Sequence, residues 1–381
     1  MSLREGYTTG SSATAAAMAA FALLLGVRLP DSIDCPLPPF KDNETRHNKR
    51  HLIPLHSLEM RDNCARAVVI KDGGDDPDAT HRAPIIAEVA LLDADSMQPR
   101  EGEIFLPAPL PVILAGGEGV GRATLPGLPV AVGEPAINPV PRRQIQEGLR
   151  EIAMQYGYTG GLKVTISVQD GAKIATKTLN PRLGIVDGIS ILGTQGTVRP
   201  YSNEAWMASI LEGLSVARAV GCPRVFLTTG RRSERLLQEQ FPDRAQAYIQ
   251  VADFAEYSLR SAVETGFTEI IWGCFFGKLV KLAQGLGHTH AHSAPLEMDK
   301  LAAWCAEAGD DFPPELMAQI SACTTANQAL SYIQPRSDAE KILHFIALKA
   351  KATAESFAPD ARITMMLFSM DPAEHKELVR L

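Results

Sequence analysis

The sequence predicts an α/β protein of two domains, for three reasons. The chain has 381 residues, 45% of them apolar, and at about 150 residues per domain this length is enough for two hydrophobic cores. Up to about residue 200 the pattern is one of strands joined by turns, with few helices. Beyond it, helices alternate with short β-rich apolar runs, which is typical of a parallel sheet with crossover helices. A cluster of Gly, Thr, Pro and Ser at 193–202 therefore separates a domain 1–199 from a domain 200–381.

In the first domain, alanine and leucine dominate residues 13–25 and predict a helix that Ser11 or Ser12 can cap. A second, amphipathic helix is expected at 144–156, entered through Pro141. Strands are expected at 33–37, 52–58, 65–70 and 85–92, and a hairpin at 163–168 and 172–178 around Gln169-Asp170-Gly171.

The second domain is predicted as a regular succession of elements. Helices are expected at 204–220, from Ser233, at 251–265, after Gly277, and at 298–308, 315–330 and 339–353. Strands are expected at 224–227, 269–274 and 362–368. Because helices separate successive strands, the strands should run parallel.

Composition excludes several classes of protein. The net charge of −7 argues against non-specific nucleic-acid binding, although an anionic ligand needs only a local group of arginines. Six cysteines without a CxxC pair suit reduced thiols better than a disulfide framework or a zinc site. Residues 6–27 carry no charge, but they are too alanine-rich for a membrane span and no cleavage site follows. We expect a cytoplasmic protein without membrane or nucleic-acid partners; self-association is left open.

Two Thr-Thr-Gly segments stand before helices. Thr8, Thr9, Gly10, Ser11 and Ser12 offer hydroxyls and free N–H groups at a helix start, which suits either an anion site or an ordinary N-cap. Thr228, Thr229 and Gly230 follow a predicted strand, where open α/β sheets bind their ligands.

A glycine-rich segment at 116–121 (GGEGVG) follows an apolar run. Its spacing is GxGxG rather than GxGxxG, and Pro126 stands where a helix should continue. Dinucleotide binding is therefore disfavoured, and a flexible loop that contacts some ligand is the interpretation we adopt.

Charged clusters supply three further candidates. The loop 72–81 holds four carboxylates, which suit a cation, a base or simply a solvated hairpin loop, and its spacing is not that of an EF-hand. Alternate histidines at 288, 290 and 292 could share one face of a strand and hold a metal, though no other ligand stands nearby. Arg142, Arg143 and Arg182 follow Asn-Pro turns, where they are either carboxylate forks or surface arginines.

Taken in order, these segments resemble the cobalt-precorrin-5B methyltransferase family of anaerobic cobalamin biosynthesis, CbiD. The resemblance rests on residues 3–10 (LREGYTTG), 71–81 (KDGGDDPDATH), 133–143 (GEPAINPVPRR), 180–186 (NPRLGIV), 188–194 (GISILGT), 228–231 (TTGR) and 277–283 (GKLVKLA), followed by His290. It spans nearly the whole chain. The family usually has Thr-Cys where this chain has Ser11-Ser12, and glycine where it has Asp187.

The resemblance implies methyl transfer from S-adenosylmethionine to carbon 1 of a tetrapyrrole that itself carries the cobalt, giving cobalt-precorrin-6A. It also implies an α+β N-terminal domain with a mixed sheet, for the tetrapyrrole, and a Rossmann-like C-terminal domain, which we expect to hold the donor. No metal site belonging to the protein is expected. A non-catalytic tetrapyrrole or metal carrier and a nucleotide-dependent oxidoreductase are the alternatives.

We therefore expect three groups of site residues. The predicted catalytic residues are Asp75, Asp76 and His290. The predicted substrate-binding residues are Thr8, Thr9, Gly10, Ser11, Ser12, Arg142, Arg143 and Arg182, because a tetrapyrrole carries acetate and propionate arms. The predicted cofactor-binding residues are Thr228, Thr229, Gly230, Gly273, Gly277 and Lys278.

Overall fold

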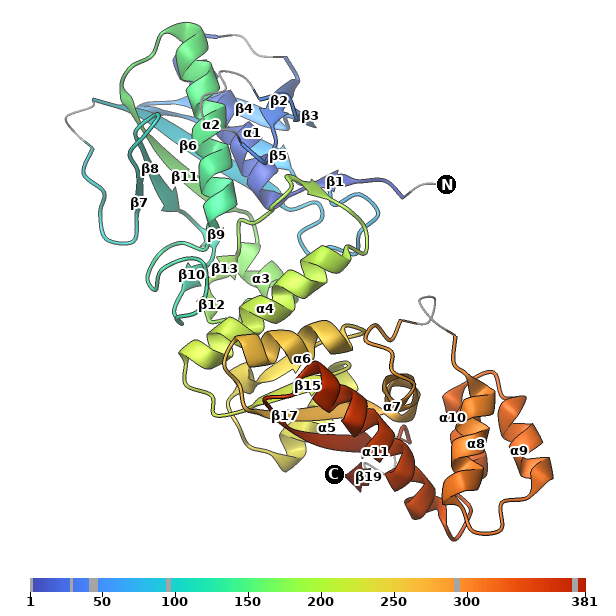
Figure 1. The fold of residues 1–381 in the computed structure, drawn as a ribbon. Helices are drawn as coiled ribbons and strands as arrows, with labels where there is room; N and C mark the ends of the chain where they lie inside the picture. Colours follow the sequence, from blue (N-terminus) through green and yellow to red (C-terminus); the bar gives the residue numbers. More distant parts are fainter. Residues whose placement is uncertain (1–2, 28–29, 41–46, 94–96, 291–294, 372–375) are drawn as a thin grey trace. The chain divides into compact units, whose positions relative to one another are not determined.

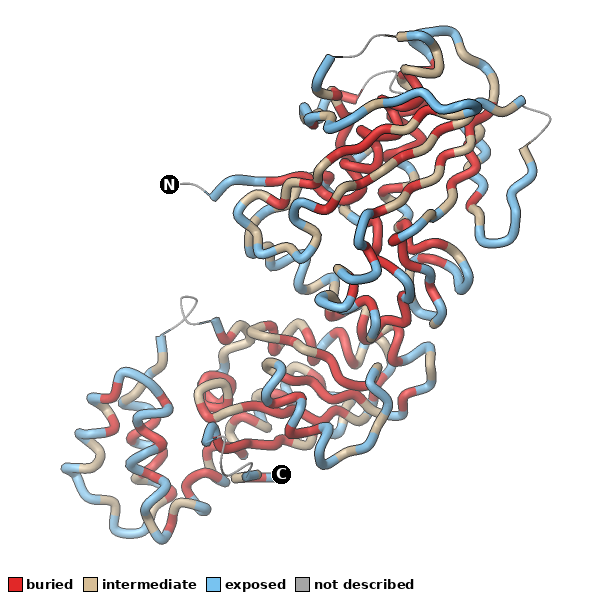
Figure 2. The backbone as a smooth tube through the Cα atoms, turned by 180° about the vertical axis from the view of Figure 1, so that it is seen from behind, coloured by how far each residue is buried: buried red, intermediate tan, exposed pale blue. Residues whose placement is uncertain are grey.

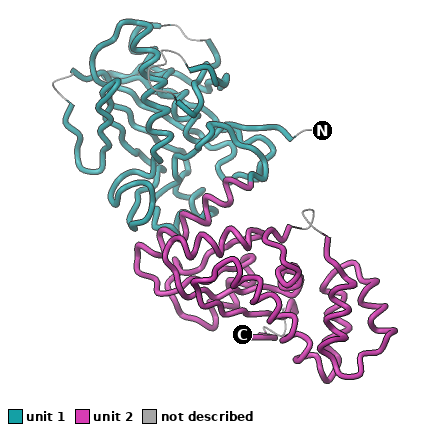
Figure 3. The backbone as a smooth tube through the Cα atoms, in the orientation of Figure 1, with its two compact units in different colours: residues 1–202 teal, residues 203–381 magenta. Residues whose placement is uncertain are grey.

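The computed structural model describes residues 3–27, 30–40, 47–93, 97–290, 295–371 and 376–381. The chain divides into two compact units, Met1–Ser202 and Asn203–Leu381 (Figure 3). Each unit has its own sheet and its own hydrophobic core. Together they make a mixed α/β protein, which confirms the predicted fold class.

Unit 1 is built on a six-stranded sheet in the order β4-β5-β6-β11-β8-β7 (Figure 1). Its strands are β4 (Ser57–Arg61), β5 (Cys64–Ile70), β6 (Pro84–Leu92), β7 (Ile104–Leu106), β8 (Val112–Gly116) and β11 (Gly161–Val168). The β8–β11 pair is parallel and the other pairs are antiparallel, so the sheet is mixed.

Two helices cover this sheet. Helix α1 (Thr9–Leu24) packs against β5 and β6, and α2 (Pro139–Tyr156) packs against α1. Because α1 consists largely of alanine, every residue from Thr9 to Ala22 is buried without crowding its neighbours. Strands β6 and β11 alternate between buried and half-buried positions, as expected for a sheet with one covered face (Figure 2).

The rest of unit 1 consists of short elements near the ends of these strands. A hairpin is formed by β2 (Ser32–Pro36) and β3 (Arg50–Pro54). Three two-residue pairs follow: β1 (Gly6–Tyr7) with β14 (Thr197–Val198), β9 (Gly119–Val120) with β13 (Gly188–Ile189), and β10 (Arg122–Ala123) with β12 (Ile185–Val186).

Two predictions in unit 1 were wrong. The single strand expected at 52–58 is divided between β3 and β4, because Pro54 has no N–H with which to continue a ladder. The strand expected at 172–178 begins as the short helix α3 (Gly171–Ala175). Strand β11 already has β6 and β8 on its two sides, so no free edge remains for a hairpin partner.

Unit 2 contains a five-stranded sheet in the order β16-β15-β17-β18-β19. Its strands are β15 (Val225–Thr228), β16 (Tyr248–Gln250), β17 (Glu269–Phe275), β18 (Arg362–Phe368) and β19 (Glu377–Arg380). The first four strands are parallel to one another, and β19 is antiparallel to β18. In chain order this is the doubly wound arrangement 2-1-3-4-5. The more specific description as Rossmann-like stays a prediction.

The connections between the parallel strands are helical. They contain α5 (Arg231–Gln240), α6 (Ala255–Glu264), α7 (Phe276–Ala283) and α11 (Ala339–Phe357), while α4 (Asn203–Ala219) precedes the sheet. Three further helices lie between α7 and α11: α8 (Met298–Ala308), α9 (Pro314–Ser321) and α10 (Ala326–Ile333). The single helix expected at 315–330 was wrong, because Thr325 accepts the Gln328 N–H at 3.1 Å and starts a new helix.

Within the described ranges, no helix is both long and apolar enough to cross a bilayer. The six cysteines are all free thiols. Burial raises the pKa of Cys274 and of Cys305 to about 12, so both are inert at neutral pH.

Candidate functional site

The strongest candidate site in unit 2 lies where its parallel strands end. Strand β15 has β16 on one side and β17 on the other. The connection from β15 to β16 and the connection from β16 to β17 therefore run in opposite directions across the sheet. Ligands of open α/β sheets bind at such a switch point, beyond the carboxyl ends of the strands. Thr229 and Gly230 follow β15, and Gly277 and Lys278 follow β17. We call these four residues the strand-end group.

Two glycines of the strand-end group leave open space. A Cβ atom on Gly230 or on Gly277 would meet no atom within 4 Å. Gly230 has φ 165°, an extended conformation that any residue adopts, so backbone strain does not require glycine here. The Thr229 N–H donates to the Gly273 carbonyl at 3.4 Å. The open space beside Gly230 lets a ligand approach its backbone from the carboxyl side of the sheet.

The other two predicted cofactor residues are used by the fold. Thr228 is buried and donates its hydroxyl hydrogen bond to the Ile249 carbonyl at 3.3 Å. Gly273 packs against α5, because a Cβ there would lie 2.5 Å from the Leu237 Cδ1 atom. Both residues position the strand ends and do not open onto them.

An ionic cluster adjoins the strand-end group. Lys278 forms an ion pair with Asp253, and its Nζ donates to the Thr289 hydroxyl at 3.2 Å. The nearby Lys281 donates to the carbonyls of Thr289, at 2.9 Å, and His290, at 3.1 Å. Although burial alone would raise the pKa of Asp253, the Lys278 ammonium lowers it. Burial and the Lys278 charge lower the pKa of Lys281.

Sequence reasoning missed Asp253 and Lys281. Asp253 follows β16, a strand of three residues that we did not predict. Had that strand been recognised, the position of Asp253 just beyond it would have identified the residue as a third contributor to the strand ends.

The predicted catalytic His290 lies beside this cluster. Its ring stacks near that of His288, with 6.1 Å between centroids. His292 lies outside the described residues. Among the described residues, no three His, Cys, Asp or Glu side chains gather as a metal site.

In unit 1, the helix start at Thr8–Ser12 is closed by the protein itself. Thr8 accepts the Ser11 N–H at 3.2 Å, and the Thr9 hydroxyl bonds to both backbone groups of Leu192. The Ser11 hydroxyl donates to the Gly196 carbonyl at 2.7 Å, and that of Ser12 to the Thr8 carbonyl at 2.9 Å. The backbone N–H of Gly10 donates to the Leu192 carbonyl at 3.1 Å. These five of the eight predicted substrate-binding residues are all buried and have partners.

In the loop 72–81, which we call the acidic loop, the carboxylates contact cationic side chains or backbone N–H groups of unit 1. Asp72 pairs with Arg4, whose hydrogen bonds lower the pKa of Asp72 to about 2. Asp78 pairs with the buried Lys71, and this charge lowers the Asp78 pKa although burial opposes it.

Of the two predicted catalytic carboxylates in this loop, Asp75 accepts the Arg4 N–H at 2.7 Å. Asp76 accepts the Tyr201 N–H at 3.0 Å. Asp75 is exposed and Asp76 half-buried, so both remain accessible to a ligand.

The predicted arginine forks differ from one another. Arg142 is mostly buried and holds the Ile137 carbonyl and the Glu134 carboxylate, each at 2.6 Å. Arg143 is 43% exposed, lies 3.9 Å from the Glu147 carboxylate and stands over the Phe40 ring. Arg182 is half-buried on its turn. Arg142 therefore braces its own loop, whereas Arg143 and Arg182 present surface to the solvent.

The glycine loop at 116–121 is packed rather than open. A Cβ on Gly119 would overlap the Val168 carbonyl, and one on Gly117 would overlap the Ser167 side chain. These glycines let the loop lie directly against β11, which is a structural use.

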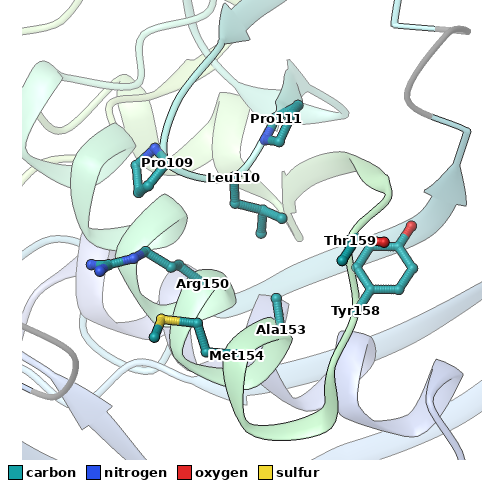
Figure 4. A pocket seen from close by; sticks show the side chains of 8 residues that line it. All are labelled: Pro109, Leu110, Pro111, Arg150, Ala153, Met154, Tyr158 and Thr159. Atoms are coloured by element: carbon teal, nitrogen blue, oxygen red, sulfur yellow. The ribbon is translucent and has the colours of Figure 1, made fainter.

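Two surface hollows are present in unit 1. One, of about 370 Å³, lies between Pro109–Pro111 and the α2 residues Arg150, Ala153 and Met154, with Tyr158 at its side (Figure 4). No predicted site residue lines it. The other, of about 230 Å³, lies between the acidic loop and α3.

The chain matches known proteins along most of its length. The CbiD family model matches residues 1–200, and the model of the CbiD C-terminal domain matches residues 288–374. A cobalt-precorrin-5B C(1)-methyltransferase of Nitratidesulfovibrio vulgaris is 49% identical over 375 residues, which are 98% of this chain and 92% of that protein. One of a Geobacillus species is 41% identical over 333 residues, 87% of this chain and 84% of that protein. A crystal structure of the cobalamin biosynthesis protein CbiD of Archaeoglobus fulgidus is 26% identical, covers 74% of this chain and 79% of that one, and gives a TM-score of 0.36. The chain belongs to the CbiD family.

Proposed function

We propose that this protein methylates carbon 1 of cobalt-precorrin-5B, with S-adenosylmethionine as the donor, in the cytoplasmic synthesis of cobalamin. The observation that carries the proposal is the 49% identity, over almost the full length of both chains, to a protein named for that reaction.

The residues of unit 2 fit the donor. Gly230 and Gly277 leave space at the strand ends, and no hydrogen bond from the Thr229 hydroxyl to a described residue competes with a ligand. The Lys278 ammonium suits the carboxylate of an amino acid, and the Asp253 carboxylate suits its ammonium group or a ribose hydroxyl. When bound, S-adenosylmethionine supplies an electrophilic methyl group.

The protein's own contribution is mainly alignment. Holding two reactants in line replaces a bimolecular encounter and lowers the barrier by up to about 7–11 kcal/mol. We assign the tetrapyrrole to unit 1, where Arg143 and Arg182 suit its carboxylate arms, while Arg142 and the Thr8–Ser12 segment hold the surrounding loops. Asp75, Asp76 and His290 are the candidate proton-transfer groups.

The test is anaerobic incubation of the full chain with cobalt-precorrin-5B and S-adenosylmethionine that carries a trideuterated methyl group, followed by mass spectrometry. We expect a product heavier by one labelled methyl group. Gly230→Leu should abolish formation of this product by filling the space beside β15, and Gly230→Ala should reduce it less.

Two outcomes would contradict the proposal. Binding of the tetrapyrrole without any gain in mass would favour a carrier protein. Consumption of a nicotinamide cofactor with no methyl transfer would favour the oxidoreductase.

A further inference from the structure

The second hollow of unit 1 is strongly basic. It is lined by His81 and Arg82 from the end of the acidic loop, and by Gln169, Asp170, Lys173 and Lys177 from the segment after β11. We call it the basic hollow. Three of these residues are fully charged cations, and Asp170 supplies the single carboxylate of the lining.

The cations of the basic hollow lack acidic partners. Arg82, Lys173 and Lys177 form no ion pair with any carboxylate in the described part of the chain. Elsewhere in unit 1 the pattern is different: Arg50 pairs with Asp34 and Glu151, and Arg142 with Glu134. Like charges gathered in one concave place repel each other and lower stability unless an anion joins them.

The acidic loop next to the hollow does not neutralise it. Asp78 is held by Lys71 and by the Thr80 hydroxyl at 2.6 Å, and Asp72 is held by Arg4. His81 accepts the Gly73 N–H on Nδ1 at 3.0 Å, so its proton is on Nε2 and this nitrogen is a further donor. Asp72 and Asp78 are thus paired with Arg4 and Lys71, and the loop contributes hydrogen-bond donors to the hollow.

The two walls of the hollow are joined and carry local strain. The Gln169 N–H donates to the Pro84 carbonyl at 3.1 Å, which ties the segment after β11 to the end of the acidic loop. Arg82 has φ 64° and Asp170 has φ 57°, left-handed conformations that cost a non-glycine residue about 1 kcal/mol or more. Both strained residues line this one hollow, so its shape is held before any ligand arrives.

We propose that the basic hollow binds carboxylate arms of the tetrapyrrole, an inference that rests on the proposed function. Lys173 lies in α3 and Lys177 in the turn directly after it, and their long flexible stems can follow arms of acetate or propionate length. A volume of about 230 Å³ admits such arms but not the macrocycle itself. The hollow therefore orients the edge of the substrate and leaves the ring outside.

The test compares charge reversals in the full-length protein. Lys173→Glu with Lys177→Glu should weaken cobalt-precorrin-5B binding about tenfold or more in an anaerobic absorbance titration. The same variant should keep its affinity for S-adenosylmethionine in calorimetry and its melting temperature. The control, Lys300→Glu with Lys341→Glu on exposed positions of unit 2, changes the net charge equally and should leave both affinities unchanged. Lys173→Arg with Lys177→Arg should retain tetrapyrrole binding.

The outcomes separate this inference from the proposed function. If the reversal variant binds the tetrapyrrole as tightly as the wild type and still methylates it, the basic hollow is not a substrate site, and the proposed function stands. If the wild type binds no tetrapyrrole, both fail. If inorganic phosphate at matched ionic strength displaces the tetrapyrrole, the hollow is a general anion site and the carboxylate assignment is overturned.

Discussion

The two Thr-Thr-Gly segments of this protein have the same sequence, but one is enclosed by hydrogen-bond partners and the other has open space beside its glycine. Thr8-Thr9-Gly10 begins α1 with its hydroxyls and its glycine N–H bonded inside unit 1. Thr228-Thr229-Gly230 precedes α5 with open space beside its glycine. A tripeptide that suits an anion is thus a structural cap in one unit and a candidate ligand site in the other. The surroundings, and not the tripeptide, decide its use.

The physical origin of this difference is what covers each helix start. Strand β14 pairs with β1, and residues 190–196 supply the carbonyls that occupy the start of α1. Helix α5 begins at the carboxyl ends of parallel strands, where connections turn away from the sheet. We call the contacts between Thr8–Ser12 and residues 190–196 the seal of unit 1.

The largest expected effect comes from breaking the seal. Gly193 has φ 141°, and a Cβ there would lie 2.5 Å from the Thr8 Cβ. Gly193→Ala should therefore destabilise unit 1 by about 3 kcal/mol, through overpacking and backbone strain. Gly230→Ala, which meets no atom, should change stability by less than about 0.5 kcal/mol.

These two variants can be followed unit by unit. All three tryptophans (Trp206, Trp272 and Trp304) lie in unit 2, so their fluorescence reports its unfolding. Hydrogen exchange of the peptide that covers α1 reports unit 1. Gly193→Ala should speed exchange in α1 and leave the tryptophan transition in place. Unchanged exchange in α1 would mean that the seal does not depend on this contact.

A smaller effect is expected from the threonine hydroxyls. Thr8→Ala removes an N-cap and should cost about 1 kcal/mol of unit 1 stability, with donor affinity unchanged. Thr229→Val keeps the shape and should leave stability within about 0.5 kcal/mol while weakening donor binding about three- to tenfold, the loss of one hydrogen bond. Calorimetric titration with S-adenosylmethionine distinguishes the two. Equal donor affinity in both variants would remove Thr229 from the donor site.

The local pattern of the sequence was sufficient for most elements of the fold. Alanine-rich α1 and the apolar runs of β15, β17 and β18 owe their conformation to neighbours a few residues away. Two departures from prediction have local causes, Pro54 at the end of β3 and the cap at Thr325, and the third was decided by distant partners. The segment after β11 could not form a strand because β6 and β8 had already taken both edges of β11.

The candidate site was harder to predict than the fold, for the same reason. Whether Thr9 is free depends on Leu192, which is 183 positions away. The basic hollow joins Arg82 to Lys173 and Lys177, and no local motif connects them. The comparisons confirm the predicted family, but only the packing shows which polar residues remain available for a ligand.

The smallest effect concerns the ion pair at the edge of the seal. Arg4 precedes the Thr8 segment and holds Asp72, whose pKa is lowered to about 2 from an ordinary value near 3.8. A carboxyl with a lowered pKa in the folded state adds stability above its ordinary pKa, and this stability is lost as the pH falls from about 4 to 2. Because both side chains are partly exposed, the contribution should be under about 1 kcal/mol.

Amide hydrogen exchange of the peptide that covers α1, at pH 6 and at pH 3, measures the contribution of this ion pair to stability. Asp72→Asn should lose stability at pH 6 and lose less than the wild type on acidification. Asp62→Asn, at an exposed position without an ion pair to a described residue, should behave as the wild type at both pH values. If Asp72→Asn lost as much stability between pH 6 and pH 3 as the wild type, the acid-induced loss would come from other carboxylates. The seal would then consist of the backbone contacts and hydroxyls around Thr8 alone.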